Sequence, residues 1–230
     1  MPEHAATNAL THSAEDYLKA IYALSGDAPA STTRIAQRLD LAPASVSGMI
    51  RRLSEQDLIA HEPYRGVVLT PAGRRLALRV LRRHRVIETY LVQCLGYRLD
   101  DVHEEADRLE HAVSDVLVER MAAAVGHPRV DPHGDPIPDR NGALDEVRYT
   151  ALPDLPIGVE AELCRVDTSD GDRLRYVARA GLVPGARVQL LDREPFDGPV
   201  TVRVGGRKKV LGLDMAMLLL CASISAAAST

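Results

Sequence analysis

The spacing of the apolar residues changes once along the chain, and this change constrains the fold more than any other feature. From His12 to about Val125, apolar residues recur three and four positions apart, which is the period of an amphipathic helix. From Val159 onward, short apolar runs alternate with turns that contain Gly and Pro, which is typical of strands. The sequence therefore predicts a mainly helical N-terminal two-thirds followed by a small all-β barrel.

The helical part has the order of a winged helix-turn-helix domain. Helices are expected at 12–25, at 33–39, from Pro43 or Ala44 onward, at 71–95, and at 99–125 with a break near Ser114. Two short extended runs with a basic turn between them predict a β-hairpin before the fourth helix. Residues 127–156 contain six prolines and little periodicity, which predicts a linker. The strands of the barrel are expected at 161–166, 187–191, 200–204 and 209–211.

Charge is segregated within the helical part. Residues 30–85 contain eleven arginines and four acidic residues, a net charge of +7, whereas residues 86–147 contain fourteen acidic and five basic residues, a net charge of −9. A basic block favours a polyanion as partner, and an acidic block favours a cation. Trp is absent and Phe occurs once, which disfavours single-strand binders that stack bases on aromatic side chains.

Neither secretion nor membrane insertion is expected. The three cysteines lack the pattern of a disulfide framework, and no apolar stretch of signal-peptide length follows Met1. The apolar run 215–221 is too short to span a bilayer. We therefore expect a cytoplasmic protein without a membrane partner.

The third helix is expected to lie in the major groove of double-stranded DNA. Its first turn offers hydroxyls to phosphates and small side chains to thymine methyl groups, two arginines follow it, and another arginine lies at the hairpin tip. The candidate DNA-binding residues are Pro43, Ala44, Ser45, Ser47, Arg51, Arg52 and Arg65. The alternative is an ordinary three-helix scaffold with solvated arginines.

Four metal-ligating side chains share one face of the last predicted helix, within an arc of about 100° at 100° per residue. On the preceding helix, His84 lies on the apolar stripe and Glu88 follows one turn later. Buried charges without partners are costly, and a cation removes that cost. Imidazole and carboxylate without thiolate favour Mn²⁺ or Fe²⁺ over structural zinc. For each residue alone, a salt bridge is the alternative. The four residues are His103, Asp107, Glu110 and His111.

The chain resembles the diphtheria toxin repressor family of metal-dependent transcriptional regulators. The resemblance is carried by residues 14–22, 64–73, 84–85, 102–111 and 132–138. It implies a winged helix DNA-binding domain at 1–75, a helical metal-binding and dimerisation domain at 76–145, a linker at 146–156, and an SH3-like (FeoA-like) domain at 157–230.

The resemblance also implies two metal ions per subunit. The primary site would use Asp16, Asp107, Glu110 and His111, and the ancillary site would use His84, Glu88 and His103, with Asp170 from the SH3-like domain. Iron-type members carry Met and Cys at the positions of Asp16 and Asp107, so the carboxylates favour Mn²⁺, with Fe²⁺ as the alternative. Lys19 and Arg173 depart from the family pattern, since some members have Glu and a neutral amide there.

We therefore expect a Mn²⁺-activated homodimeric repressor that binds operator DNA, controls metal homeostasis, and is not an enzyme. An iron-dependent repressor of the same family is one alternative. A metallohydrolase and a metal-independent architectural DNA-binding protein, neither of which belongs to this family, are the others.

Overall fold

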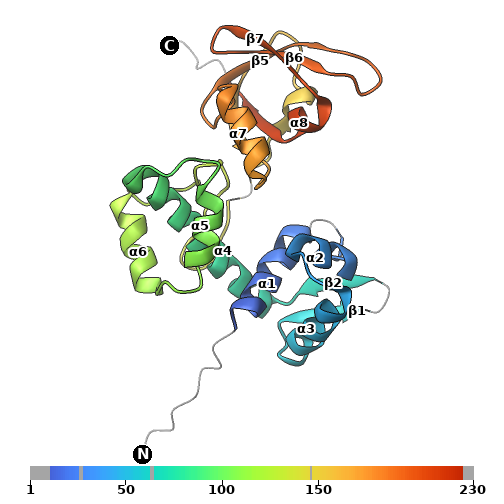
Figure 1. Cartoon of the computed structure of the whole chain (residues 1–230), viewed down its shortest axis with the longest axis vertical. Coiled ribbons are helices and arrows are strands. Elements are labelled where there is room, and N and C mark those ends of the chain that lie inside the picture. Colours follow the sequence, from blue (N-terminus) through green and yellow to red (C-terminus); the bar gives the residue numbers. More distant parts are fainter. Residues whose placement is uncertain (1–10, 26–27, 63–64, 146, 225–230) are drawn as a thin grey trace, which may run out of the picture. The chain divides into compact units, whose positions relative to one another are not determined.

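The computed structural model describes residues 11–25, 28–62, 65–145 and 147–224, and the chain divides into two compact units (Figure 1). The first comprises Met1–Arg83 with Pro138–Ala143, and the second comprises His84–Ile137 with Leu144–Thr230. The long helix α4 (Pro71–Leu95) contributes its first half to one unit and its second half to the other.

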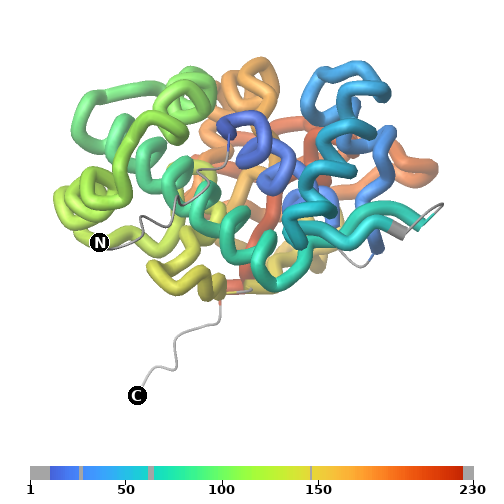
Figure 2. The backbone as a smooth tube through the Cα atoms, turned by 90° about the horizontal axis from the view of Figure 1, so that it is seen from below, coloured from blue at the N-terminus to red at the C-terminus, as the bar shows by residue number. Residues whose placement is uncertain are grey.

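The first unit is the predicted winged helix. It contains α1 (His12–Leu24), α2 (Thr32–Leu39), α3 (Pro43–Glu55), β1 (Ile59–Glu62) and β2 (Gly66–Leu69). The two strands pair antiparallel as a hairpin (Figure 2). Apolar side chains at helical spacing bury the core; Tyr17, Leu18, Ile21, Ile35 and Leu53 are almost fully buried.

Side-chain caps define where two of these helices begin, and two glycines allow neighbouring segments to pack closely. The Thr11 side chain accepts a hydrogen bond from the amide of Ala14 and so caps α1, and Ser31 caps α2 in the same way. Gly66 has a φ of 120°, and a Cβ there would lie 2.8 Å from the carbonyl oxygen of Ala30. A Cβ on Gly73 would lie 1.9 Å from the carbonyl oxygen of Leu58, so only glycine allows α4 to pack against this turn.

The predicted last helix of the helical part is two helices. Helix α5 (Val102–Leu109) and helix α6 (Asp115–Ala124) are separated at the predicted break, because the Ser114 side chain caps α6 by accepting a hydrogen bond from the amide of Leu117. Two small apolar clusters hold these helices against the second half of α4. One contains Ile87 and Val102, and the other contains Val86 and Val118.

The C-terminal domain is one antiparallel sheet with the strand order β3-β8-β4-β5-β6-β7, packed around the largest apolar core of the second unit. Its strands are β3 (Thr150–Ala151), β4 (Glu160–Val166), β5 (Arg187–Arg193), β6 (Val200–Val204), β7 (Arg207–Leu211) and β8 (Leu219–Ser223). The predicted fold class is confirmed. The domain also contains helices α7 (Gly171–Arg179) and α8 (Leu213–Met217) and a single 3₁₀ turn (Leu152–Asp154).

The segment predicted as a linker, 146–156, overlaps the first strand of the C-terminal sheet. Strand β3 pairs with β8 through Thr150↔Cys221 and Ala151↔Leu220. Leu152 and Leu155 are buried in the core of the sheet. Residues 150–155 are therefore part of the C-terminal domain, because their apolar side chains complete its core.

Within the described part of the chain, no helix is long and apolar enough to cross a bilayer.

Candidate metal centre

His84 is the side chain around which the candidate centre is built. It lies on the buried face of α4 with 5% of its surface exposed, as its place on the apolar stripe predicts. Its Nδ1 lies 2.6 Å from Oε2 of Glu110, and its Nε2 lies 3.0 Å from Oε1 of Glu88, one helical turn further along α4. The imidazole therefore has a carboxylate on each side.

Helix α5 adds a second imidazole and a third carboxylate. His103 Nδ1 lies 3.0 Å from both His84 Nε2 and Glu88 Oε1. Asp107 Oδ1 lies 3.3 Å from His84 Nδ1, and its side chain is 47% exposed. The structure thus brings together His84, Glu88 and His103, the three predicted ancillary ligands from the helical domain.

Glu110 and His111 lie where α5 ends. Glu110 is the C-terminal cap residue of α5 and is fully buried, and His111 follows in the turn before α6. His111 Nε2 lies 3.4 Å from Glu110 Oε1. The predicted arc is therefore formed by the end of a helix and the turn after it, and not by one continuous helix.

The two remaining predicted ligands, Asp16 and Asp170, belong to the winged helix and to the C-terminal domain. Asp16 is half-buried on α1 of the first unit, whereas the other three primary ligands belong to the second unit. Asp170 is exposed, and its side chain accepts hydrogen bonds from the amides of Asp172 and Arg173, which caps α7. Both assignments stay predictions.

A loop of the proline-rich segment 127–156 brings two further candidate ligands to the same place. His133 Nδ1 lies 3.8 Å from Oε2 of Glu88, and Asp131 completes a group of three whose ligand atoms lie within 4.8 Å of one another. The Nε2–H of His133 donates to the carbonyl oxygen of Leu99 at 3.0 Å. That bond leaves Nδ1 facing the carboxylate, an arrangement that is usual for metal-ligating histidines.

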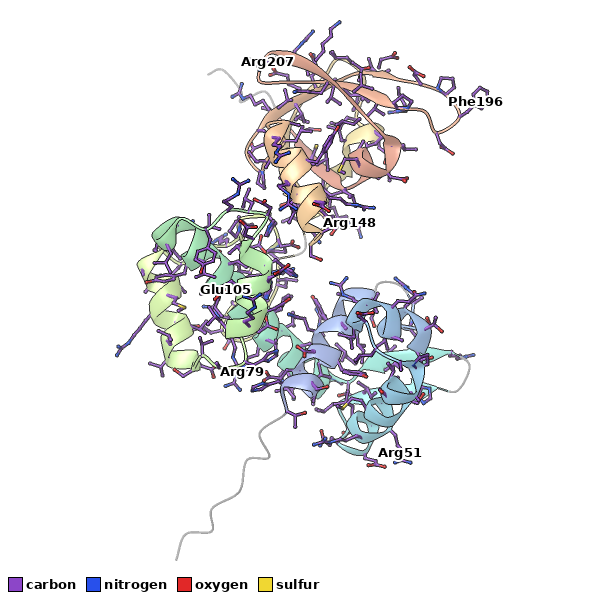
Figure 3. The ribbon with its side chains drawn as sticks, viewed as in Figure 1. Arg51, Arg79, Glu105, Arg148, Phe196 and Arg207 are labelled. Carbon is purple, nitrogen blue, oxygen red and sulfur yellow. The ribbon has the colours of Figure 1, made fainter. Side chains whose placement is uncertain are left out.

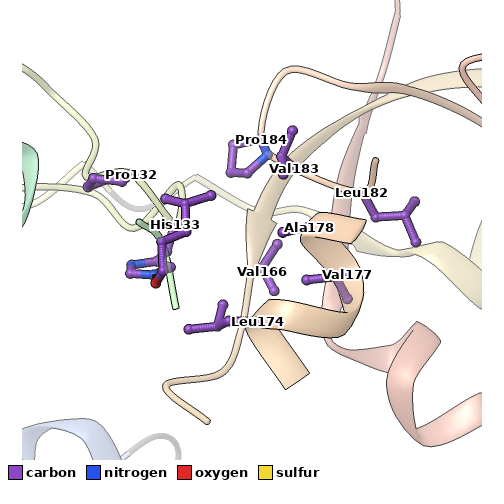
Figure 4. Close-up of a pocket in the computed structure, with 10 residues that line it drawn as sticks. Pro132, His133, Val166, Leu174, Val177, Ala178, Leu182, Val183 and Pro184 are labelled. Carbon is purple, nitrogen blue, oxygen red and sulfur yellow. Dashed lines mark hydrogen bonds between the residues drawn. The ribbon is translucent and has the colours of Figure 1, made fainter. Parts of the chain in front are cut away.

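Backbone and packing contacts hold this loop to the C-terminal domain. The carbonyl of His133 accepts a hydrogen bond from the amide of Val166 in β4. Gly134 has a φ of 88°, and a Cβ there would lie 1.8 Å from the carbonyl oxygen of Cys164. Pro132 and His133 line one side of a small apolar pocket whose other side includes Leu174 and Val177 of α7 and Val166 of β4 (Figure 4). The many prolines of this segment predicted a linker, so His133 and Asp131 were not predicted as ligands. Residues 132–138 were nevertheless among the segments that carry the resemblance.

An arginine balances part of the negative charge of the loop. Arg85 Nε lies 3.5 Å from Oδ2 of Asp131, and its Nη2 lies 3.0 Å from Oδ1 of Asp135. Arg165 of β4 lies 2.9 Å from the same Asp135 oxygen. The side chain of Asp131 also accepts the amides of His133 and Asp135, which fixes its orientation.

Burial and neighbouring charges shift the pKa values of four buried residues of the cluster. Burial opposes the charge on His84, but Glu88, Asp107 and Glu110 outweigh it and hold its pKa well above the ordinary value. Burial likewise opposes the charge on Glu88, yet His84, His103 and His133 hold its pKa well below the usual range. Burial lowers the pKa of His133, but Glu88 and Asp131 raise it to about 9. Burial, Asp135 and Glu88 raise the pKa of Asp131 to about 7.

The raised pKa values of His84 and His133 favour their charged forms beside the buried carboxylates. Among the described residues of the second unit, three overlapping groups bring ligand atoms within 4.8 Å: His84–Glu88–His103, His84–Asp107–Glu110 and Glu88–Asp131–His133. All donors are imidazole nitrogens and carboxylate oxygens, and a divalent cation can replace the protons that they share. The donor set therefore fits a divalent metal ion such as Mn²⁺ or Fe²⁺.

The predicted DNA-binding residues lie on the surface of the first unit. Pro43 opens α3, and Ala44, Ser45 and Ser47 are exposed in its first turns. The Arg51 side chain is 82% exposed (Figure 3) and forms an ion pair of 3.7 Å with Glu55, and Arg52 is exposed beside it. Arg65 is exposed directly before β2, whereas Pro63 and Tyr64 of the hairpin tip lie outside the described residues.

Three family models together match most of the chain. Residues 9–67 match the iron dependent repressor N-terminal DNA binding domain, residues 70–139 match the iron dependent repressor metal binding and dimerisation domain, and residues 150–222 match the FeoA domain.

Curated proteins and solved structures match over nearly the whole length. The iron-dependent repressor IdeR of Mycobacterium tuberculosis is 33% identical over 216 residues, which covers 88% of this chain and 93% of IdeR. The diphtheria toxin repressor of Corynebacterium diphtheriae is 30% identical over 221 residues, which covers 90% and 95%. The structure of a manganese-dependent transcriptional repressor in complex with manganese is 40% identical, with a TM-score of 0.85, and covers 92% of this chain and 100% of its own. The manganese regulator SloR is 35% identical, with a TM-score of 0.77, and covers 93% and 100%.

These matches exclude the metallohydrolase alternative, because they are to repressors and not to enzymes. The chain belongs to the diphtheria toxin repressor family of metal-dependent transcriptional repressors.

Proposed function

We propose that this chain is a Mn²⁺-activated transcriptional repressor that binds operator DNA as a homodimer and controls metal homeostasis in the cytoplasm. The observation that carries the proposal is the buried cluster around His84, whose donors are only imidazole nitrogens and carboxylate oxygens. Carboxylates at Asp16 and Asp107 extend this oxygen-rich set, and hard oxygen donors suit Mn²⁺.

The primary site of the proposal is Asp16, Asp107, Glu110 and His111. A bound cation would supply positive charge to Glu110, which is fully buried beside the His84 and His111 imidazoles. Asp16 lies on α1, which packs in the core of the winged helix, so its ligation would connect the DNA-binding domain with the metal-binding domain. Metal would then favour the arrangement of the two domains in which all four ligands meet. The predicted division into 1–75, 76–145 and 157–230 stays part of this proposal, with residues 150–155 added to the last domain.

We extend the ancillary site to include His133 and Asp131 beside His84, Glu88 and His103. Glu88 supports this extension because one of its carboxylate oxygens faces His84 and His103 while the other faces His133. Asp170 stays a candidate ligand from the resemblance alone.

Replacing His133 with glutamine tests the extension. We expect H133Q to lose ancillary-site Mn²⁺ binding by about 10- to 100-fold while primary-site binding is retained, because only one imidazole ligand is removed. Isothermal titration of the full chain with Mn²⁺ measures both sites. H127N is the matched control, since His127 is exposed, is not part of the cluster, and has a φ of 54° that asparagine adopts readily. Titration curves of H133Q that superimpose on those of the wild type would restrict the ancillary site to the predicted ligands.

The dimer is expected to form through apolar side chains exposed in the segment that matches the dimerisation domain. Leu95 at the end of α4 is 60% exposed, and Val116 and Leu117 on α6 are 66% and 43% exposed. Contiguous exposed apolar side chains mark interaction surfaces, and Val116 and Leu117 are adjacent on α6. A second copy of the chain would cover them.

Leu117→Asp is expected to weaken the dimer by about 100-fold or more, because two carboxylates enter the apolar interface of each dimer. Sedimentation equilibrium at micromolar concentration measures the change. Ile157→Asp is the control, since Ile157 is 59% exposed outside the matched dimerisation segment. A dimer of unchanged affinity in the Leu117 variant would place the interface elsewhere.

Metal-dependent retardation of a promoter fragment separates the proposed function from its rivals. The proposal predicts retardation with Mn²⁺ and none after chelation. Retardation that requires Fe²⁺ would favour the iron-dependent alternative, which is also supported by the likeness to IdeR and the diphtheria toxin repressor. Retardation that does not depend on metal would identify an architectural DNA-binding protein.

A further inference from the structure

The β6–β7 hairpin of the C-terminal sheet concentrates positive charge. It carries four basic residues within seven positions and no acidic residue: Arg203, Arg207, Lys208 and Lys209. The strands are joined by Gly205 and Gly206, whose φ values of 53° and 75° suit a two-residue turn that matches the twist of the strands. Figure 3 labels Arg207, which begins β7 directly after this turn.

The arrangement of these charges is unfavourable for the fold itself. The register places Arg203 directly opposite Lys208, and both side chains are exposed. Like charges directly opposite each other on a sheet are destabilising. Arg203 donates a hydrogen bond to the neutral side chain of Gln189 on β5. Nothing in this pairing compensates for the repulsion.

Acidic partners are also absent from the rest of the hairpin. Within the described ranges of the chain, Arg207, Lys208 and Lys209 form no ion pair. Two other arginines of the same unit do have acidic partners, since Arg165 is paired with Asp135 and Arg175 with Asp100. The charge of the hairpin is therefore available to an external anion.

Lysines on an edge strand can prevent pairing with another sheet, but this role explains only part of the positive charge of the hairpin. Strand β7 is at the end of the strand order, and lysines on an edge strand discourage pairing with another sheet. Arg203, however, lies on β6, which is paired on both sides by β5 and β7. Its charge needs another explanation.

We propose that the β6–β7 hairpin binds the phosphate backbone of double-stranded DNA, as a contact additional to that of the winged helix. The inference rests on the proposed function, because a winged helix bound to DNA keeps the rest of the chain at high effective concentration near the same polyanion. The hairpin has Arg and Lys for phosphates and no aromatic residue on which an unpaired base could stack. The contact is therefore independent of base sequence.

The test is the salt dependence of DNA binding by the full chain with saturating Mn²⁺. In the Arg207→Gln/Lys208→Gln variant, two phosphate contacts are lost per subunit, and each contributes about 0.9 to the slope of log affinity against log salt. We expect the negative slope of log affinity against log salt to become shallower by about 2 to 4 for the dimer. The change should be equal for an operator duplex and for an unrelated duplex. Fluorescence anisotropy between about 50 and 200 mM salt measures it.

The matched control is Arg148→Gln/Arg179→Gln, which removes the same charge from exposed positions of the same unit outside the hairpin. Its slope should equal that of the wild type. A wild-type slope in the hairpin variant, with Mn²⁺-dependent operator binding intact, would overturn the hairpin contact and leave the proposed function standing. Hairpin-dependent binding to phosphatidylglycerol vesicles without any change on DNA would overturn it in favour of a membrane contact. Failure of the wild type to bind any operator would overturn the proposed function as well.

Discussion

Replacing His111 with alanine is expected to abolish metal-stimulated operator binding while the protein stays folded and dimeric. His111 follows α5 in a turn, beside the fully buried Glu110, and belongs to none of the apolar clusters. Its loss therefore costs little packing, but it removes one of the proposed primary ligands and about 100-fold or more of metal affinity. Isothermal titration with Mn²⁺ and operator binding at fixed free Mn²⁺ measure the two effects.

A second histidine in the same acidic block provides the control. His127 is exposed and has a φ of 54°, a conformation that asparagine adopts readily, so His127→Asn leaves the backbone unstrained. We expect this variant to bind Mn²⁺ and operator like the wild type. If His111→Ala matched the wild type at equal free Mn²⁺, the cluster would be a network of salt bridges and not a metal site.

The second large effect concerns which metal activates the protein. Raw affinity follows the Irving–Williams order, so Zn²⁺ is expected to bind more tightly than Mn²⁺. Mn²⁺ accepts a larger set of oxygen ligands, whereas Zn²⁺ prefers a tetrahedral set that would leave one carboxylate of the primary site unused. If the unused ligand is Asp16, the winged helix is not connected to the metal-binding domain. We therefore expect Mn²⁺ to stimulate DNA binding more than Zn²⁺ does at matched occupancy.

The double variant Asp16→Met/Asp107→Cys should shift the preference toward Fe²⁺ and Co²⁺, because softer sulfur donors favour the later metals. Operator binding against buffered free metal, for the wild type and the double variant, measures the shift. Asp16→Asn/Asp107→Asn serves as a control that keeps oxygen donors but removes their charge, and it should weaken the response to every metal. An equal response of the wild type to Zn²⁺ and Mn²⁺ at matched occupancy would contradict the geometric argument.

The winged helix and the helices of the candidate metal centre could be predicted from the sequence because their determinants are local. Apolar spacing located α1 to α4, and the capping serine at Ser114 marked the break between α5 and α6. The i,i+4 spacing of His84 and Glu88 placed both side chains on one buried face of α4. Each of these inferences needs only a few neighbouring residues.

The parts that sequence reasoning missed depend on contacts between distant residues. Strand β3 is two residues long and exists because it pairs with β8, about seventy residues later. Helix α7 buries only Leu174 and Val177, too few apolar residues for a clear helical period. His133 joins the cluster because the tertiary structure places its loop beside Glu88 and Leu99, and the surrounding prolines indicated only a linker.

The role of Asp16 as a metal ligand stays a prediction that rests on the family resemblance. Its carboxylate is on α1 of one unit, and its proposed partners are in the other. The resemblance supplies the connection between them, and only a metal-dependent property of the whole protein can test it.

The most direct test is operator binding by the wild-type protein as free Mn²⁺ is varied with a metal buffer under reducing, anaerobic conditions. The account predicts a rise in operator affinity of at least about 100-fold, which is nearly 3 kcal/mol, as the primary site fills. It also predicts that Asp16→Ala removes this rise without removing Mn²⁺ binding to His84, Glu88 and His103. Operator affinity that stays constant across the Mn²⁺ range, or that rises only with Fe²⁺, would contradict a manganese-activated repressor.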